Sequence, residues 1–187
     1  MVLPVYLYGH PVLRKTTEPI KENSDELQKL IADMWETMYH SDGVGLAAPQ
    51  IGKSISMVVI DGSPVAEVFP ECKDSKMVII NPELEVMEDT EPITRDEGCL
   101  SLPGLSEPVK RYEHIRLKWL DENFAGHEQE FSGFISRIIQ HECDHLEGIV
   151  YMDRVSPIRK QLCRGKLMGI VKGKVNCDYR TKAAPKR

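Results

Sequence analysis

Apolar residues recur at the spacing of an α-helix in two stretches of the chain. The first stretch runs from about residue 23 to residue 40, and its apolar positions are Leu27, Leu30, Ile31, Met34, Trp35 and Met38. This spacing predicts an amphipathic helix of roughly four turns. Asn23, followed three residues later by Glu26, resembles a capping pair, and the polar residues before Gly43 mark the end of the helix.

The second helical stretch runs from residue 132 to residue 148. Its apolar positions are Phe134, Ile135, Ile138, Ile139 and Leu146. Ser132 can cap the start of this helix, and Gly148 can adopt the left-handed conformation that ends one. The pattern therefore predicts a second helix with a defined beginning and end.

Strand patterns fill most of the chain between these helices. Residues 114–120 alternate clearly between apolar and polar side chains, and further strands are predicted at 55–60, 77–80, 84–87 and 126–131. Residues 1–22 show no periodicity and are expected to be irregular. Because the strands follow one another instead of alternating with helices, we expect an α+β fold. Mostly antiparallel sheets would pack around the 132–148 helix, with one N-terminal helix.

Composition is typical of one globular domain. Hydrophobic residues make up 41% and charged residues 28% of the 187 positions, which suffices for a sizeable core. The five cysteines are odd in number and scattered, which favours reduced thiols. The first residues do not resemble a signal peptide and no apolar run reaches transmembrane length, so we expect a cytoplasmic protein.

The sequence His141-Glu142-x-x-His145 lies inside the second predicted helix. At about 100° per residue, a helix places the two histidines about 40° apart on one face, so both imidazoles can reach one metal ion. Glu142 falls on the adjacent flank, where its carboxylate can contact a water at the metal without becoming a ligand. The pattern indicates metal-assisted hydrolysis.

A catalytic site of this kind needs a third protein ligand and an open position. Downstream, Glu147 is too close to turn back onto the metal, and Tyr151 stands where the longer HExxHxxGxxH pattern has its last histidine. Cys143 points away from the histidine face. Upstream, Cys99 is the best candidate because Gly98 leaves room beside it, but a buried structural thiol explains its spacing equally well.

Three stretches resemble the signature motifs of the peptide deformylases, in the same order. They are Gly43-Val44-Gly45-Leu46-Ala47-Ala48-Pro49-Gln50, Glu97-Gly98-Cys99-Leu100-Ser101 and Gln140-His141-Glu142-Cys143-Asp144-His145-Leu146-x-Gly148. By itself the first stretch is also explained by a tight turn between a helix and a strand. The resemblance extends from about residue 3 to about residue 160. It implies an enzyme that removes the N-formyl group from nascent proteins beginning with formyl-methionine.

The resemblance also implies a role for individual residues. Cys99, His141 and His145 would be the metal ligands, and Glu142 the general base and acid in the attack of a metal-bound water on the formyl carbonyl. The Gln50 side chain and the Leu100 backbone N–H would stabilise the oxyanion, with Gly45 among the catalytic residues. The substrate-binding residues would be Gly43, Val44, Gly45, Glu97, Phe134, Arg137 and Ile138, with Arg111 paired to Glu97 beneath the site. Other members often carry aliphatic residues where this chain has Phe134 and Arg137.

The implied cofactor is one divalent ion per chain. Iron(II) is the usual ion in the family, and zinc, nickel or cobalt can replace it. Two other functions explain part of the sequence. A metallopeptidase that cleaves internal bonds would share the helix but lacks its downstream ligand. A non-catalytic module that docks on ribosomal RNA would need a fourth protein ligand for a structural metal.

Charge is distributed unevenly along the chain. Residues 154–187 contain 11 Lys and Arg and one acidic residue, a net charge of +10, so residues 1–153 carry −15 of the total of −5. We therefore divide the chain into a single catalytic metallohydrolase domain, residues 1–165, and a basic C-terminal tail, residues 166–187. The tail is either an attachment to a polyanion or a solvated terminus. The expected partners are nascent formyl-methionine polypeptides and, through the tail, the ribosome; neither a membrane nor DNA is expected.

Overall fold

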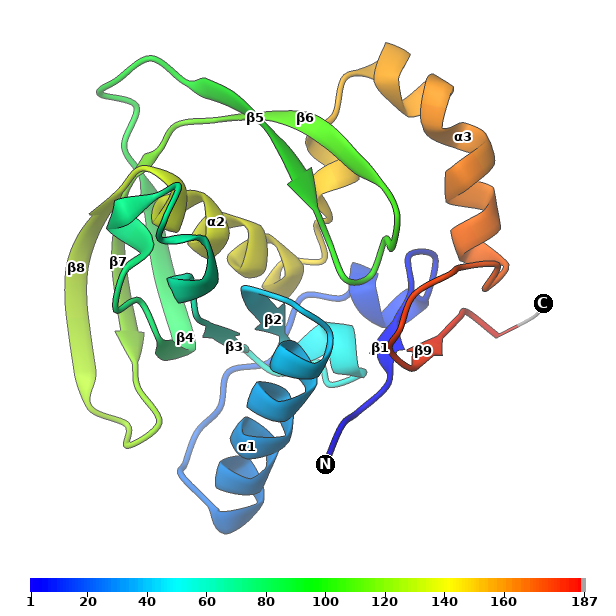
Figure 1. Ribbon diagram of the computed structural model, residues 1–187. Coiled ribbons are helices and arrows are strands. Elements are labelled where there is room, and N and C mark those ends of the chain that lie inside the picture. The colour runs from blue at the N-terminus through cyan, green and yellow to red at the C-terminus, as the bar shows by residue number, and fades with distance from the viewer. Residues whose placement is uncertain (186–187) are drawn as a thin grey trace.

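A five-stranded antiparallel sheet forms one side of the molecule (Figure 1). The computed structural model describes residues 1–185. The strands of this sheet, in spatial order, are β2 (Gly45–Ala47), β3 (Met57–Ile60), β4 (Met77–Val86), β7 (His114–Leu120) and β8 (Gly126–Ser132). Mixed helices and antiparallel sheets are what the sequence predicted, so the fold class is confirmed at this level.

Two smaller sheets complete the strand pairing. β5 (Ile93–Gly98) and β6 (Ser106–Arg111) form an antiparallel hairpin, and β1 (Val5–Tyr6) pairs in parallel with β9 (Thr181–Lys182). The helices are α1 (Asp25–His40), α2 (Phe134–Leu146) and α3 (Pro157–Val171). Short 3-10 helices are η1 (Pro11–Arg14), η2 (Ala48–Ile51), η3 (Ser63–Val65), η4 (Pro70–Cys72) and η5 (Tyr151–Arg154).

The strands that alternate most clearly in sequence have the bounds that the pattern predicts. β7 matches its prediction at both ends, and β8 is one residue longer. The two strands predicted at 77–80 and 84–87 are wrong as separate elements, because β4 continues through Asn81 and Pro82 with a shift of register between Ile80 and Glu83. Asn81 adopts a φ of 49°, so the chain absorbs the proline by a local irregularity and keeps its pairing with β7.

The hairpin β5–β6 and the strand β2 were not predicted. β5 reads Ile-Thr-Arg-Asp-Glu-Gly and β6 reads Ser-Glu-Pro-Val-Lys-Arg, so charged residues occupy both faces and hide any apolar alternation. Three of these charged residues, Glu97, Glu107 and Arg111, are nevertheless buried. Their burial depends on ion pairs with other elements, which local periodicity cannot reveal.

The N-terminus of α1 lies one residue later than predicted. Ser24, not Asn23, is the N-cap, and its hydroxyl accepts a hydrogen bond from the Leu27 N–H at 3.1 Å. The Asn23 side chain instead donates to the carbonyl of Glu122 at 3.3 Å. The predicted N-cap is therefore wrong by one residue, whereas the predicted helix is present and follows the apolar pattern.

α2 is capped by a residue that is distant in sequence. Ser132 belongs to β8 and does not cap the helix, which contradicts the prediction. The Phe134 N–H donates instead to the Glu71 carboxylate at 2.8 Å, so a negative charge lies at the positive end of the helix dipole. Gly148 has a φ of 71° after the last turn, as predicted.

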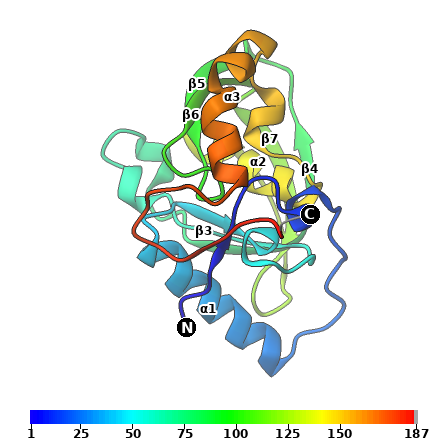
Figure 2. The same cartoon turned by 90° about the vertical axis from the view of Figure 1, so that its right-hand side faces the viewer.

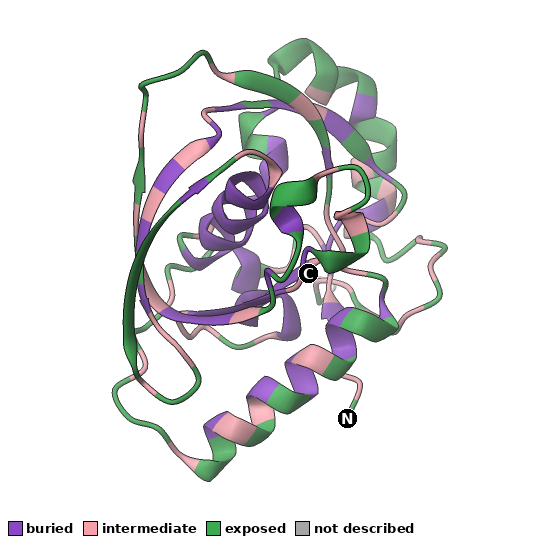
Figure 3. Cartoon of the chain, turned by 60° about the vertical axis from the view of Figure 1, so that its left-hand side comes forward, coloured by how far each residue is buried: buried purple, intermediate pink, exposed green. Residues whose placement is uncertain are grey.

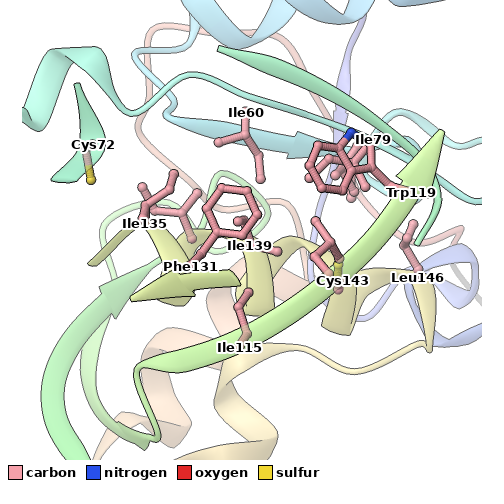
Figure 4. Close-up of a cluster of buried hydrophobic side chains, with 14 residues drawn as sticks. Ile60, Cys72, Ile79, Ile115, Trp119, Phe131, Ile135, Ile139, Cys143 and Leu146 are labelled. Carbon is pink, nitrogen blue, oxygen red and sulfur yellow. The ribbon is translucent and has the colours of Figure 1, made fainter. Parts of the chain in front are cut away.

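Every residue of α2 from Ile135 to Leu146 is buried (Figure 3). One face of the helix packs on the large sheet, where Ile139 and Cys143 approach Ile115 and Trp119 (Figure 4). The β5–β6 hairpin arches over the opposite side in Figure 1. Burial on both sides explains how a helix with many polar residues lies inside the molecule.

The chain after residue 154 folds back toward the N-terminal segment (Figure 2). The predicted boundary at residue 165 falls inside α3, and residues 172–180 connect α3 to β9. Buried Cys163 and Ile170 anchor α3 in a core cluster with Leu7, Leu102 and neighbouring residues. α3 therefore crosses the predicted boundary, and β9 pairs with β1 at the N-terminus; Lys186 and Arg187 lie outside the described residues. None of the helices in the described part of the chain has the length and apolarity needed to cross a bilayer.

The close approach at Gly148 leads to a stability prediction. Gly148→Ala would place a Cβ 2.7 Å from the backbone of Arg14 at a φ of 71°, whereas Gly104→Ala, at a φ of 72°, meets nothing within 4 Å. Left-handed strain alone should cost Gly104→Ala about 1 kcal/mol of unfolding free energy. The backbone clash should cost Gly148→Ala about 1 to 3 kcal/mol more. Urea unfolding of both variants measures the difference, and equal losses would contradict the clash.

Candidate functional site

Three side chains with metal-ligating atoms meet at the end of β5 and on α2. The ligand atoms of Cys99, His141 and His145 all lie within 4.8 Å of one another, and the Cys99 Sγ is 3.3 Å from the His145 Nε2. Both histidines come from one face of α2, as their spacing predicts, while Cys99 directly follows β5. The structure thus brings together the three residues that the sequence suggested as metal ligands.

Cys143 lies on the other side of α2, among the apolar side chains that face the sheet (Figure 4). Burial raises the pKa of the Cys143 thiol far above its usual range. A neutral thiol in this place acts as a small apolar side chain. Cys143 is therefore a matched structural cysteine for comparison with Cys99.

His141 is oriented by a buried carboxylate. Its Nδ1 lies 2.9 Å from a Glu97 oxygen, and a hydrogen bond donated from Nδ1 leaves Nε2 directed toward Cys99 and His145. Burial alone would lower the pKa of His141, but hydrogen bonds with Cys99 and Glu97 raise it well above the usual value. The surroundings of the His141 imidazole thus stabilise a positive charge on or next to the ring, which a proton or a metal ion can supply.

Glu97 is held by two buried arginines in addition to His141. Arg111 donates from Nε and a terminal nitrogen, at 2.7 and 3.0 Å, and Arg137 donates at 2.8 Å. Burial by itself raises the pKa of Glu97, but the hydrogen bonds from His141 and Arg111 outweigh it, so the pKa lies far below its usual range. The carboxylate stays ionised, and the predicted pairing with Arg111 is present.

The network continues around the helix through two further acids. Asp144 accepts from Arg111 at 3.0 Å and from Arg154 at 2.6 Å. Glu113 accepts from Arg137 at 2.8 Å and from Arg95 at 2.8 Å. These acids were not predicted as site residues; Asp144 could have been found from its position inside the helix motif, whereas Glu113 has no local signal.

Gln50 lies beside the cysteine with a defined amide orientation. Its Oε1 accepts a hydrogen bond from the Ala47 N–H at 2.8 Å, so its NH₂ group must face the Cys99 Sγ and the Ser101 hydroxyl, each at 3.3 Å. The backbone N–H of Leu100 has no hydrogen-bond acceptor within residues 1–185. Two N–H donors therefore lie next to the cysteine, and of these the Leu100 N–H has no acceptor in the described part of the chain.

Glu142 points into a space that a glycine keeps open. A Cβ at Gly45 would lie 2.5 Å from the Glu142 Oε1, so a larger residue there would displace the carboxylate. Burial raises the pKa of Glu142 to about 7. Its Oε2 has no hydrogen-bond partner within residues 1–185. The Oε2 is thus a buried acceptor that a bound water or substrate can satisfy.

Two cavities share Val44, Gly98, His141 and Glu142 in their walls. The larger is a cleft of about 480 Å³, lined also by Gln50, Cys99 and Leu100, by the predicted Gly43 and Gly45, and by residues 102–106 and Asn176, Cys177 and Tyr179. The smaller, about 150 Å³, is lined also by Asp96, Glu97, Phe134, Arg137 and Ile138. The predicted substrate residues thus divide between the wall of the larger cleft and the smaller side pocket.

Arg137 has little freedom within that side pocket. All three of its guanidinium nitrogens donate hydrogen bonds, to Glu97, Glu113 and the carbonyls of Ile93 and Val109. The residue is 1% exposed. The guanidinium group is therefore fully engaged by protein acceptors. A ligand in the side pocket could make only van der Waals contacts with the Arg137 side chain.

The donor set matches what a divalent metal ion needs. Ligand atoms about 2.0 to 2.3 Å from one ion are roughly 3.5 Å apart in a tetrahedral site, close to the 3.3 Å between the Cys99 and His145 ligand atoms. Burial lowers the pKa of His145 well below its usual value, so its imidazole is neutral and can ligate. One sulfur and two nitrogens would hold a four-coordinate ion with one position left for a ligand that is not protein.

Known proteins resemble this chain in sequence and structure. The sequence model of the family described as polypeptide deformylase matches residues 2–161. A peptide deformylase of Salinibacter ruber is 45% identical over 184 residues, covering 96% of this chain and 93% of that protein. The solved peptide deformylase structure from Legionella pneumophila has a TM-score of 0.80 at 35% identity, covering 93% of this chain and 98% of that chain. The structure from Thermotoga maritima has a TM-score of 0.75 at 38% identity, covering 84% and 99%.

The arrangement of the two cysteines predicts the result of metal analysis. Cys99→Ala removes one of three clustered ligand atoms, so the metal content of the purified protein should fall from about one ion per chain to nearly none. Cys143→Ala removes a thiol that faces the sheet and should leave the metal content unchanged. Elemental analysis of both variants makes the comparison, and metal retained in Cys99→Ala would contradict the ligand assignment.

Proposed function

The chain belongs to the polypeptide deformylase family, whose members are enzymes that remove N-formyl groups, and we propose that it releases formate from the N-terminal formyl-methionine of nascent proteins. The observation that carries this proposal is that Cys99, His141 and His145 meet beside Glu142 at a cleft of about 480 Å³. We also propose a cytoplasmic location, where nascent chains are made.

The family implies a catalytic metal, and Cys99, His141 and His145 would hold it. We propose iron(II) as the resident ion, with zinc, nickel or cobalt able to replace it. When bound, a divalent ion in this site supplies Lewis acidity toward the formyl carbonyl and lowers the pKa of a water molecule. Glu97 fixes the His141 ring, and Arg111 and Arg137 keep Glu97 ionised for that purpose.

Gln50 and Leu100 would stabilise the charge that develops on the formyl oxygen. The Gln50 NH₂ group lies 3.3 Å from the Cys99 Sγ with its orientation set by the Ala47 N–H, and the Leu100 N–H belongs to the residue after Cys99. Donors that the fold orients in advance can stabilise a developing negative charge. Loss of one such donor typically costs about 3 to 4 kcal/mol in the barrier. A neutral amide suits position 50, because a carboxylate would repel the oxyanion.

Glu142 would move the proton. Its unpartnered Oε2 accepts a proton from the attacking water and returns it to the leaving amine. Gly45 supports this role because the absence of a Cβ leaves the carboxylate in place. Val44, Phe134, Ile138 and the side chain of Arg137 would enclose the methionine side chain in the smaller cavity, while Gly43 and Gly45 would lie along the peptide.

The function itself is tested by formate release. Anaerobically prepared protein is incubated with a formyl-Met peptide and, separately, with casein. Formate release without cleavage of casein is the expected result. Cleavage of internal bonds in casein without formate release would instead make the protein an endopeptidase.

Glu142 is expected to be essential for turnover and dispensable for metal binding. Glu142→Ala keeps all three ligands, so metal content should persist while formate release nearly vanishes. The matched control is Glu147→Ala, which removes the exposed glutamate at the C-cap of α2 and should retain activity. Gln50→Glu should also be severely impaired. An active Glu142→Ala protein would show that another group takes the proton.

We further propose that the basic C-terminal region holds the enzyme near ribosomes, where formylated N-termini emerge. Arg164, Lys166 and Lys172 are exposed on or just after α3, and the apolar side chains of Ile158 and Leu162 are exposed on the same helix. Such a surface can contact phosphates through its cations and protein through its apolar side chains. The catalytic residues all precede residue 146, so attachment and chemistry would use different parts of the chain.

Charge reversal on α3 tests this attachment better than truncation, which would also remove β9. Arg164→Glu with Lys172→Glu should weaken ribosome binding several-fold and flatten its salt dependence, because phosphate contacts release counterions. Activity on a short formyl-Met peptide should stay unchanged. The control is Lys21→Glu with Lys53→Glu, which makes the same charge change on the N-terminal part of the chain. Equal binding of both variants, measured by sedimentation at two salt concentrations, would refute the attachment.

A further inference from the structure

The turn that follows β5 is held at three successive carbonyl groups. The Cys99 carbonyl accepts from the Leu102 N–H at 2.8 Å, within the turn itself. The Leu100 carbonyl accepts from the hydroxyl of Tyr179 at 2.8 Å, and the Ser101 carbonyl from the N–H of Tyr8 at 2.9 Å. Two of the three donors come from outside the turn, one from each end of the chain.

These two ends are joined to each other by backbone hydrogen bonds. β1 and β9 pair in parallel, with Val5 opposite Thr181 and Tyr6 opposite Lys182. The Leu7 N–H donates to the Lys182 carbonyl at 2.9 Å. We call residues 5–8 and 179–182 together the terminal brace; in Figure 2 the segment after α3 crosses the molecule and returns beside the N-terminal segment. The brace lies against the turn through Tyr8 and Tyr179.

Tyr179 lies outside residues 2–161, the part of the chain that the family model matches. It is partly buried, and with Asn176 and Cys177 it lines the large cleft. The side chain therefore contacts both the cleft and the backbone that follows the cysteine ligand. Its hydroxyl and its ring can have separate effects, the first on the turn and the second on the cleft wall.

The Leu100 backbone lies between two carbonyl groups that accept hydrogen bonds, one of them from Tyr179. Its N–H is the proposed oxyanion donor, and its carbonyl, on the next peptide unit, is the group that Tyr179 holds. The preceding peptide unit is fixed by the bond between Leu102 and Cys99. Holding the carbonyls on both sides of Leu100 restricts its φ and ψ, and thus the direction of its N–H. A donor must lie about 2.7 to 3.1 Å from the oxyanion to stabilise it.

We propose that Tyr179 is a positioning residue for deformylation, whose hydroxyl fixes the Cys99–Leu102 turn so that the Leu100 N–H stays aimed at the substrate carbonyl. The proposal rests on the proposed function and deepens it. It gives the C-terminal segment a part in the reaction that is separate from attachment to ribosomes. It also predicts that the effect appears in kcat, because the oxyanion forms only in the transition state.

The test compares Tyr179→Phe with Tyr6→Phe in the full-length, metal-loaded protein. Both variants lose one tyrosine hydroxyl from the terminal brace, but the Tyr6 hydroxyl accepts from Lys182 at 3.1 Å and does not bond to the turn. Tyr179→Phe should lower kcat for a formyl-Met peptide about 3- to 10-fold, the range of one neutral hydrogen bond, with KM changed less than about twofold. Tyr6→Phe should match the wild type. Unchanged kcat in Tyr179→Phe, or a loss confined to KM, would overturn the proposal.

A second measurement does not depend on activity. Hydrogen exchange at the Leu102 amide, followed in metal-free protein, reports the opening of the turn. Exchange should be faster in Tyr179→Phe than in wild type or Tyr6→Phe, and equal rates in all three would refute the positioning role. Wild-type protein that releases no formate would overturn the proposed function itself, whereas an active wild type with an equally active Tyr179→Phe variant would overturn only the role of Tyr179.

Discussion

The buried carboxylate of Glu97 holds together the parts of the chain that carry the site. It is the next-to-last residue of β5, two residues before Cys99, and it accepts hydrogen bonds from Arg111 of β6 and from Arg137 and His141 of α2. An isolated charge in this position would cost several kcal/mol in lost hydration. The carboxylate is therefore stable only while the hairpin and the helix stay in register. The same contacts fix the distance between the cysteine and the two histidines.

Arg137 shows how this constraint shapes the cavity beside it. The guanidinium ties α2 to β5 through the Ile93 carbonyl and to β6 through the Val109 carbonyl, besides its ion pairs. An aliphatic residue, which the resemblance led us to expect in other members, would leave Glu97 with one arginine fewer. In this chain the wall of the side pocket therefore contains an arginine whose charge is paired with Glu97 and Glu113 inside the protein.

α2 is covered on both sides, by the large sheet on its apolar face and by the β5–β6 hairpin on its polar face. The side chains of Ile139 and Cys143 face the large sheet, while His141 and Glu142 line the cleft and His145 lies next to Cys99. Low solvent access raises the pKa of Glu142 and keeps His145 neutral. Packing against the sheet makes the helix rigid, which gives the polar face the positional accuracy that catalysis requires.

The sequence by itself determined the elements whose pattern is local. The apolar spacing of α1 and α2, the alternation of β7 and the left-handed stop at Gly148 all follow from side-chain periodicity and backbone preference, and the 3.6-residue turn puts His141 and His145 on one face. Spacing alone left two interpretations of Cys99, a metal ligand or a buried structural thiol. Only the resemblance of residues 97–101 to a known motif favoured the ligand.

Only the tertiary structure decided the features that depend on distant partners. The hairpin β5–β6 buries its charges against α2, the α2 cap comes from Glu71, and Tyr179 reaches Leu100 from the far end of the chain. These contacts join residues up to 79 positions apart. No local pattern encodes them, because a buried charge or a single hydroxyl becomes favourable only when folding brings its partner within hydrogen-bond distance.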